Sequence, residues 1–193
     1  MDWQRKLLGN QKRRGVLEPK FIRGVSLNEL LIGMAIIAIL MAAGAPNLGH
    51  WLKNSEIRAA ADAILNGLQL ARVEAVKRNA KTQFELTDST KSNWVVGCVR
   101  VKADCPESIQ SYSSSEGTSK VKVEADQKKF VFNGLGKIEP LPVSDVNINI
   151  SNPAGGNCMV DKGPTRCLRI AISKTGKIRM CDPSLSKDDP KGC

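Results

Sequence analysis

Six cysteines carry the most definite chemistry in this chain, and all of them lie after residue 97. In an oxidising compartment such thiols form disulfides, although sequence alone leaves many pairings open. Because neighbours close short loops, we expect three consecutive pairs: Cys98 with Cys105, Cys158 with Cys167, and Cys181 with Cys193. Free or metal-binding cysteines are the alternative. The chain has no C-x-x-C pair and no histidine besides His50, so we predict neither a metal site nor a cofactor.

Basic side chains gather in the same part of the chain: Arg166, Arg169, Lys174, Lys177, Arg179, Lys187 and Lys191. Lys177 and Arg179 lie two apart on a predicted strand, so both side chains should point to one face, beside a predicted turn at Gly176. Cations held at one edge of a hairpin can contact phosphate groups. The alternative is a solvated basic strand pair on a protein whose formal net charge is +10.

The N-terminal part of the chain contains a long apolar run with a single carboxylate near its start. Between Val25 and Leu48 the only ionisable side chain is Glu29. A helix rises about 1.5 Å per residue, so about 20 apolar residues cross a hydrocarbon core of about 30 Å. We therefore predict a transmembrane segment at 25–48, with His50 and Trp51 at the membrane–water interface.

The flanking charges predict how this segment is oriented. Residues 1–24 carry seven basic and two acidic side chains, which is half of the formal net charge of the chain. By the positive-inside rule this leader is cytoplasmic and residues 81–193 are periplasmic, where the cysteines can oxidise. An ordinary signal peptide, cleaved among the small residues 41–45, is the rival interpretation. Its product would be soluble.

Helical spacing continues beyond the apolar run. An apolar series at three- and four-residue intervals predicts an amphipathic helix at 49–80: Ile57, Ala61, Ile64, Leu65, Leu68, Ala71, Ala75 and Val76. Arg58, Asp62, Asn66, Gln69, Glu74 and Lys77 would form its polar face. Together the two segments predict one helix over 26–79, kinked at Pro46. Ser26 and Glu29 fit a capping box at its start.

After Ala80 the pattern changes to short β-prone runs separated by turn residues. We predict antiparallel strands at 82–87, 94–101, 121–124, 129–133, 146–150, 168–173 and 177–181. Loops are expected at 104–119 and 153–166, and a polar tail at 184–193. The fold class is α+β, with the long helix packed on an antiparallel β-sheet domain.

The N-terminal sequence Arg23-Gly24-Val25-Ser26-Leu27-Asn28-Glu29 resembles the leader of type IV pilins and type II secretion pseudopilins. The resemblance implies cleavage between Gly24 and Val25 by a prepilin peptidase and methylation of the new Val25 amine. It also implies that Glu29 meets this amine on a neighbouring subunit during assembly. Val25 replaces the phenylalanine that is usual at the mature N-terminus.

Three further segments, at 70–79, 131–137 and 170–181, resemble the GspH/FimT family of minor pilins and pseudopilins. The last segment matches a terminal G-R-x-R motif, with Lys177 in place of the first arginine. In the FimT branch this motif is implicated in binding DNA for uptake, so the resemblance implies a role for Gly176, Lys177 and Arg179. Lysine keeps the charge but loses the planar fork of arginine, which predicts weaker binding.

The sequence therefore predicts a filament subunit rather than an enzyme. It contains no H-E-x-x-H, G-x-S-x-G or phosphate-binding glycine loop. The expected protein is a FimT-like minor pilin of the inner membrane and then the pilus tip, with other pilins and double-stranded DNA as the expected partners. A GspH-like pseudopilin of type II secretion and a membrane-anchored periplasmic domain without a filament role are the alternatives.

Overall fold

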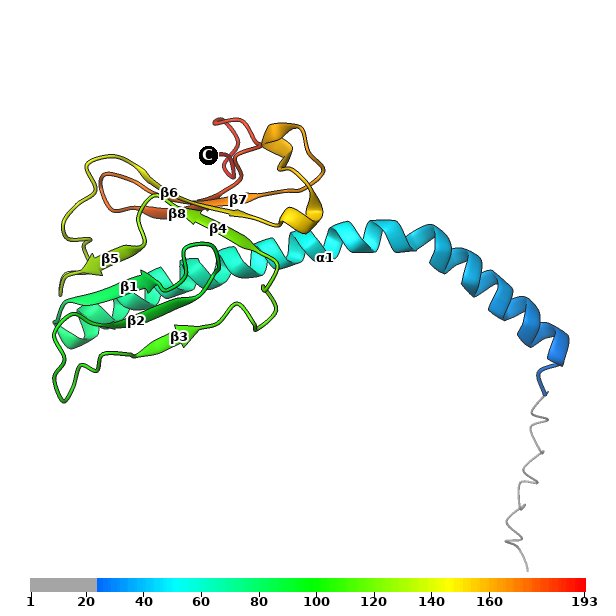
Figure 1. Cartoon of the computed structure of the whole chain (residues 1–193), viewed down its shortest axis with the longest axis horizontal. Coiled ribbons are helices and arrows are strands. Elements are labelled where there is room, and N and C mark those ends of the chain that lie inside the picture. Colours follow the sequence, from blue (N-terminus) through cyan, green and yellow to red (C-terminus); the bar gives the residue numbers. More distant parts are fainter. Residues whose placement is uncertain (1–23) are drawn as a thin grey trace, which may run out of the picture. The chain divides into compact units, whose positions relative to one another are not determined.

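The computed structural model describes residues 24–193, except for the side chains of residues 43–47. The predicted leader before Gly24 thus lies outside the described residues. Pro46, where a kink is predicted, is among the residues whose side chains are not described, so the kink stays a prediction. The chain divides into two units, Met1–Ala43 and Gly44–Cys193. One helix, α1 (Leu27–Arg78), contributes to both of them (Figure 1).

The first unit consists of the apolar start of α1. Ser26 caps the helix, because its Oγ accepts a hydrogen bond of 3.2 Å from the backbone N–H of Glu29. The large apolar side chains between Leu30 and Met41 are between 53% and 69% exposed. Within residues 24–42 and 48–193, no helix combines the length and the apolar character needed to cross a membrane. The span predicted at 25–48 stays a prediction.

In the second unit α1 buries one face. Ile57, Ala61, Ile64, Leu68, Ala71 and Ala75 are fully buried, at the predicted spacing. Two assignments to its faces were wrong: Val76 is 53% exposed, and Glu74, assigned to the polar face, is 7% exposed. The helix ends in a Schellman motif, in which Asn79 takes a left-handed φ of 46° and Ala80 N–H bonds to Ala75 O.

The remaining chain forms the predicted antiparallel β-sheet domain, which consists of two four-stranded sheets. The first sheet has the order β3-β2-β1-β5, from β1 (Thr82–Leu86), β2 (Trp94–Cys98), β3 (Gln110–Tyr112) and β5 (Lys129–Phe132). The second has the order β4-β6-β7-β8, from β4 (Lys122–Ala125), β6 (Val146–Ser151), β7 (Leu168–Ile172) and β8 (Ile178–Cys181).

Two predicted loops contain regular structure. The 104–119 stretch holds β3, whose short and polar sequence gave no alternating pattern but whose Tyr112 stacks on Trp94 of β2 with ring centroids 6.0 Å apart. The 153–166 stretch holds two short 3₁₀ helices, Pro153–Gly155 and Met159–Asp161. Conversely, β2 ends at Cys98 rather than at 101, because the chain turns back between Lys102 and Cys105 and the Cys98–Cys105 disulfide closes this loop.

Both sheets and α1 share one hydrophobic core. Its largest fully buried side chains include Phe84 and Phe130 from the first sheet and Ile148 and Ile170 from the second. Gly67 lets α1 approach closely, since a Cβ there would lie 2.7 Å from the Phe84 ring. Every residue of this core lies in the second unit, together with all three disulfides. That unit therefore contains what it needs to fold on its own.

Candidate functional site: a C-terminal hairpin and its basic hollow

The predicted turn at Gly176 joins β7 to β8. Gly176 has a left-handed φ of 78°, and its N–H donates to Ser173 O at 2.8 Å. The N–H of Ser173 in turn bonds to Lys177 O at 2.9 Å, which closes a three-residue hairpin loop of the kind that needs glycine in this position. Lys177 belongs to this turn, so the strand predicted at 177–181 begins one residue later, at Ile178.

Arg179 lies on the outer face of the second sheet, the face turned away from the core. It is paired with Ala171, which is paired with Asn147, so the three side chains share that face. The guanidinium donates through Nη1 to Gly192 O at 3.0 Å and through Nη2 to Cys193 O at 3.2 Å. Arg179 thus binds the C-terminal segment, while the side chain of Lys177 is exposed.

The segment from Asp182 to Cys193, which we call the tail, folds back over this outer face (Figure 1). The Cys181–Cys193 disulfide closes it, and the side chain of Asp182 is only 2% exposed. Burial alone would raise the pKa of Asp182, but hydrogen bonds from Ser184 and from Arg166 Nε hold it below its ordinary value. The tail is therefore an ordered part of the second sheet's surface.

Between the tail and the sheet lies a hollow of about 520 Å³, which we call the basic hollow. Four cationic side chains and one acidic side chain, that of Asp145, line it; the cations are Arg169, Lys177, Arg179 and Lys187. Arg169 is held in place by a 2.7 Å hydrogen bond from its Nε to Asn149 Oδ1. The structure thus brings the predicted residues Lys177 and Arg179 together with two further cations.

The sequence pointed to the C-terminal cations as a group but did not single out Arg169 and Lys187. Arg169 shares a face with Arg179 because β7 and β8 pair with Ala171 opposite Arg179, and the period of a strand is two. The sequence does not specify this register, because the register depends on the length of the turn between β7 and β8. Lys187 reaches the hollow only because the tail returns to the sheet. The signal for that return was the Cys181–Cys193 pair.

The three disulfides join Cys98 with Cys105, Cys158 with Cys167, and Cys181 with Cys193. These are the short-loop pairs expected from the sequence, and no described cysteine is free. The first disulfide supports the first sheet. The Cys158–Cys167 disulfide lies directly before β7, and the Cys181–Cys193 disulfide starts at the end of the edge strand β8, in the sheet that carries the basic hollow.

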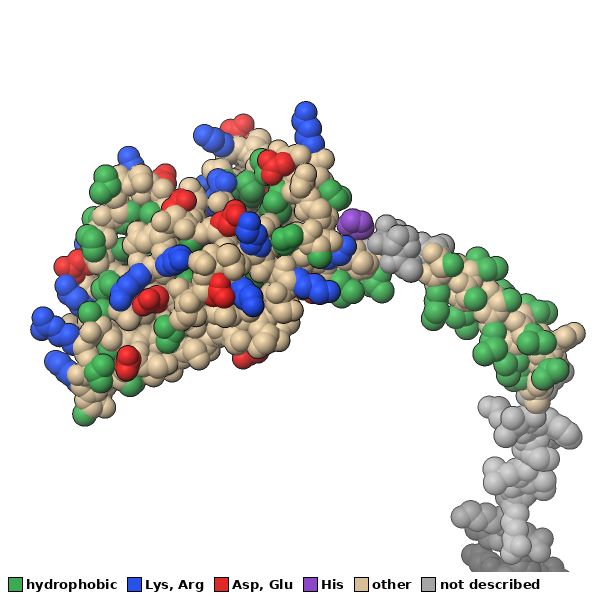
Figure 2. Space-filling view, viewed as in Figure 1, with side chains coloured by type: hydrophobic (Ala, Val, Ile, Leu, Met, Phe, Trp, Pro, Cys, Tyr) green, Lys and Arg blue, Asp and Glu red, His purple; other side chains and the backbone are tan. Residues whose placement is uncertain are grey.

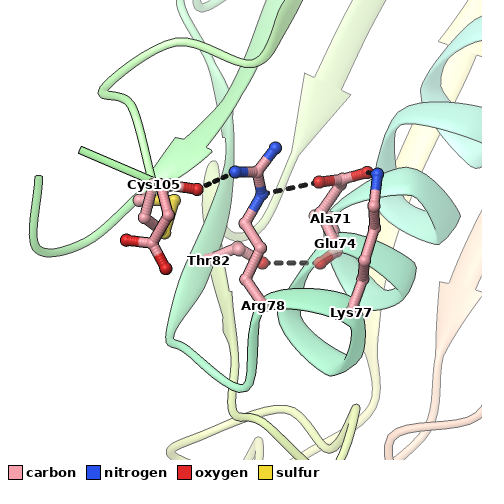
Figure 3. A network of polar contacts seen from close by, with 8 residues as sticks. Ala71, Glu74, Lys77, Arg78, Thr82 and Cys105 are labelled. Atoms are coloured by element: carbon pink, nitrogen blue, oxygen red, sulfur yellow. Dashed lines mark hydrogen bonds and ion pairs between the residues drawn. A yellow bond between two sulfur atoms is a disulfide. The ribbon is translucent and has the colours of Figure 1, made fainter. Parts of the chain in front are cut away.

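A second charged cluster lies at the end of α1 and has a structural role (Figure 3). Arg78 Nε donates to Glu74 at 2.7 Å and Lys77 Nζ at 3.3 Å, while Arg78 Nη1 donates to Asp104 O beside Cys105. The Arg78 hydrogen bond is the main reason why the pKa of Glu74 lies below its ordinary value. Thr82 Oγ1 adds a 2.5 Å bond to Ala71 O. The cluster fastens the helix to the first sheet.

The predicted processing and assembly residues lie in the first unit, apart in sequence from the basic hollow. Gly24, Val25 and Glu29 are exposed, and Val25 is 68% exposed. Glu29 stands in the first turn of α1, and its backbone N–H bonds to Ser26, which gives one half of the predicted capping box. Their roles in cleavage, methylation and assembly stay predictions.

Comparison with known proteins adds a family and a fold. The family model described as "Type II transport protein GspH" matches residues 60–176, so the match ends at the glycine of the hairpin turn. No curated protein sequence matches this chain.

The solved structures that resemble the chain include a minor pilin and a minor pseudopilin. The type IV minor pilin FimU of Pseudomonas aeruginosa matches with a TM-score of 0.50 at 18% identity, over 67% of this chain and 91% of FimU. The minor pseudopilin EpsH from the type 2 secretion system of Vibrio cholerae matches with a TM-score of 0.50 at 10% identity, over 67% of this chain and 99% of EpsH. At these identities the likeness concerns the fold alone, which is α+β and type IV pilin-like. Because the family model covers more than half of the sequence, the chain belongs to the GspH family of minor pilins and pseudopilins.

Proposed function

We propose that this protein is a minor pilin that takes part in type IV pilus assembly, at the tip of the filament, and that it binds double-stranded DNA for uptake in the basic hollow. The observation that carries the proposal is the meeting of Arg169, Lys177, Arg179 and Lys187 around one hollow. Other minor and major pilins are its partners in the filament. The family consists of structural subunits, and no catalytic activity is proposed.

The chemistry of the hollow suits a phosphate backbone rather than base edges. Two nitrogens of Arg179 are already engaged by the tail, and Arg169 Nε is engaged by Asn149. The exposed ammonium groups of Lys177 and Lys187 therefore supply the mobile charge. Lysine contacts phosphates as a point charge, without the bidentate geometry that reads a base. We expect weak binding without sequence preference, and an affinity that falls as salt rises.

The N-terminal residues suit a membrane-anchored precursor. We propose that a prepilin peptidase cleaves after Gly24, that Val25 is then methylated, and that residues 25–48 hold the subunit in the inner membrane with the second unit in the periplasm. Glu29 is the only ionisable residue in that segment, so it is the candidate partner for the Val25 amine of a neighbouring subunit. A mature N-terminus at Val25 by mass spectrometry supports this, whereas one near residue 45 contradicts it.

A GspH-like pseudopilin of the type II secretion system is the second candidate. It is favoured by the description of the matching family model, and by the engagement of Arg179 with the tail, which leaves fewer free donors for DNA. In that case the basic hollow would face another subunit of the pseudopilus. Glu29→Ala should prevent incorporation into a filament in either machine, so this variant does not distinguish the two candidates. Recovery of the wild-type protein in sheared type IV pili would favour the minor pilin over the pseudopilin.

The test of DNA binding uses charge reversal at two exposed lysines of the hollow. Purified full chain in neutral detergent should bind a labelled duplex in a fluorescence anisotropy titration at low salt. Lys177→Glu with Lys187→Glu should lower the affinity about tenfold or more and weaken its dependence on salt, since each lost phosphate contact reduces the slope of log affinity against log salt by about 1. Arg100→Glu with Lys102→Glu is the matched control, because these two exposed cations lie on the Cys98–Cys105 loop of the first sheet. Equal losses in both double variants would contradict a site in the hollow.

A further inference from the structure

A second hollow lies at the other side of the C-terminal tail, where the second unit of the chain begins. Its volume is about 650 Å³. One wall comes from α1, with Trp51, Asn54 and Arg58. The opposite wall comes from β7, β8 and the tail. It includes Arg166, which precedes β7, Leu168 and Met180 from the strands, and Lys191 from the tail. We call this hollow the proximal groove.

The two walls are joined by direct hydrogen bonds, so the groove has a fixed shape. The backbone N–H of Arg166 donates to Asn54 Oδ1 at 3.1 Å, and Arg166 Nε bonds to the buried Asp182 at 2.5 Å. A little further along α1, Asn152 Nδ2 donates to Glu56 Oε2 at 2.7 Å. These contacts hold the guanidinium of Arg166 at the groove, with half of its side chain exposed.

The lining of the groove is both cationic and apolar. Arg58, Arg166 and Lys191 are cationic and Asp182 is anionic, so three positive charges and one negative charge leave the lining with a net charge of +2. Asp182 is bonded to Arg166 and Ser184. The side chain of Arg58 is 77% exposed, and its contact with Asp62 is long, at 3.9 Å. Leu168 and Met180 are partly buried against the core and form an apolar floor. Trp51, at 62% exposure, stands at the edge of the groove.

Exposed apolar side chains continue beside the groove on the same part of α1. Leu48 is 56% exposed and Leu52 is 50% exposed. Figure 2 shows hydrophobic and basic side chains next to each other around the lone histidine, where α1 enters the second unit. In the sequence, Trp51 follows the exposed apolar run of the first unit by nine residues. An indole beside cations is typical of positions at a membrane–water interface.

We infer that the proximal groove binds the head group of an anionic phospholipid, with the phosphate between Arg58, Arg166 and Lys191 and the glycerol region against Trp51, Leu168 and Met180. The positive lining is complementary to an anionic leaflet, and the apolar floor is complementary to the carbon skeleton below the phosphate. The choice of a bilayer as the source of the ligand rests on the proposed membrane anchor. An acidic peptide of a neighbouring subunit would match the charges but would leave Trp51, Leu48 and Leu52 exposed to water.

The test uses a fragment of residues 48–193, which contains the whole core and lacks the apolar run. Its tryptophans are Trp51, which is exposed, and Trp94, which is 4% exposed, so a change of emission on binding reports on Trp51. We expect the fragment to co-sediment with vesicles of phosphatidylcholine and phosphatidylglycerol, with a blue shift of emission, and not with phosphatidylcholine alone. Inorganic phosphate should cause no blue shift.

Two variants locate the site. Arg58→Glu with Lys191→Glu should lower the vesicle partition coefficient at least tenfold, because each cation near an anionic surface contributes roughly fivefold. Arg100→Glu with Lys102→Glu, which changes the net charge equally, should lower it less than threefold. Trp51→Ala should abolish the blue shift and weaken binding while the circular dichroism stays unchanged.

The inference is overturned if the fragment does not bind mixed vesicles, if the control variant loses as much as the groove variant, or if an oligoglutamate peptide binds while vesicles do not. Failure of the proposed anchor is a separate result, since it is measured by alkaline carbonate extraction of the full chain from membranes. Failure of the proposed DNA site is also separate, because it depends on Lys177 and Lys187, which do not line the groove.

Discussion

The two sheets of the second unit have similar inner faces and different outer faces. Each inner face contributes large, fully buried side chains to the same core, such as Phe84 and Ile148. The outer face of the first sheet carries the ion pair of Glu85 and Lys129, 3.5 Å apart, which leaves no net charge. The second sheet presents Arg169 and Arg179 on its outer face instead, beneath a tail that adds Lys187. The inner faces therefore determine the fold, and the outer face of the second sheet is where the proposed function resides.

The largest expected effect comes from a cavity in the core that both sheets share. Phe84→Ala removes a fully buried ring of β1 that also contacts Trp94, with ring centroids 5.8 Å apart. We expect the free energy of unfolding to fall by about 4 kcal/mol. Chemical denaturation followed by near-ultraviolet circular dichroism measures it. DNA affinity per folded molecule should not change, and a large loss of affinity would show that the first sheet takes part in binding.

A smaller effect is expected from opening the tail. Cys181→Ser with Cys193→Ser removes the disulfide that closes a loop with a sequence separation of 12. The loss should be at most about 3 kcal/mol, because the loop is short. Hydrogen exchange should speed up in the tail and leave β1 and β2 unaffected. If β1 and β2 also exchange faster, the tail is part of the scaffold rather than a cover of the second sheet.

A still smaller effect is expected at Glu74, and it tests whether the first sheet serves as the scaffold. Because its pKa in the folded protein is below the ordinary value of 4.5, the carboxylate stabilises the fold above that pH. This stabilisation is lost as the pH falls below 4.5 through the folded pKa. Glu74→Gln should cost about 2 kcal/mol at neutral pH and flatten the acid side of the stability curve. Urea titrations across pH measure both.

Glu85→Gln is the matched control for Glu74→Gln. Its ion pair with Lys129 is solvent-exposed, with side-chain exposures of 52% for Lys129 and 40% for Glu85. Exposed pairs contribute little, so the expected change is below about 0.5 kcal/mol. A loss as large as that of Glu74→Gln would mean that burial is not what makes the helix-end cluster important.

The sequence predicted elements with strong periodicity and missed those that depend on distant contacts. The helix face from Ile57 to Ala75 could be recognised because its spacing is local. Glu74 was assigned to the polar face, since the sequence does not show that its partner Arg78 is held by Asp104 O of the Cys98–Cys105 loop, far away in the chain. β3 was missed because Gln110-Ser111-Tyr112 becomes a strand only by pairing with β2. The division into two sheets is likewise a matter of long-range pairing.

The same reasoning explains how much of the candidate site was foreseen. The turn at Gly176 and the cations beside it are local signals, and the family resemblance drew attention to them. The contribution of Arg169 depends on the register of β7 with β8, and that of Lys187 on the return of the tail. The engagement of Arg179 by Gly192 and Cys193 could not be predicted, because backbone acceptors leave no mark in a sequence.

The most direct test of the central claim is hydrogen–deuterium exchange of the full chain with and without duplex DNA at low salt. A site on the outer face of the second sheet predicts slower exchange in the turn at 173–177, in β7 and β8, and in the tail, with β1, β2 and β3 unchanged. Raising the salt should remove this protection, because binding releases counterions. Protection confined to the first sheet, or equal exchange with and without DNA under conditions where the duplex is in excess, would contradict the account.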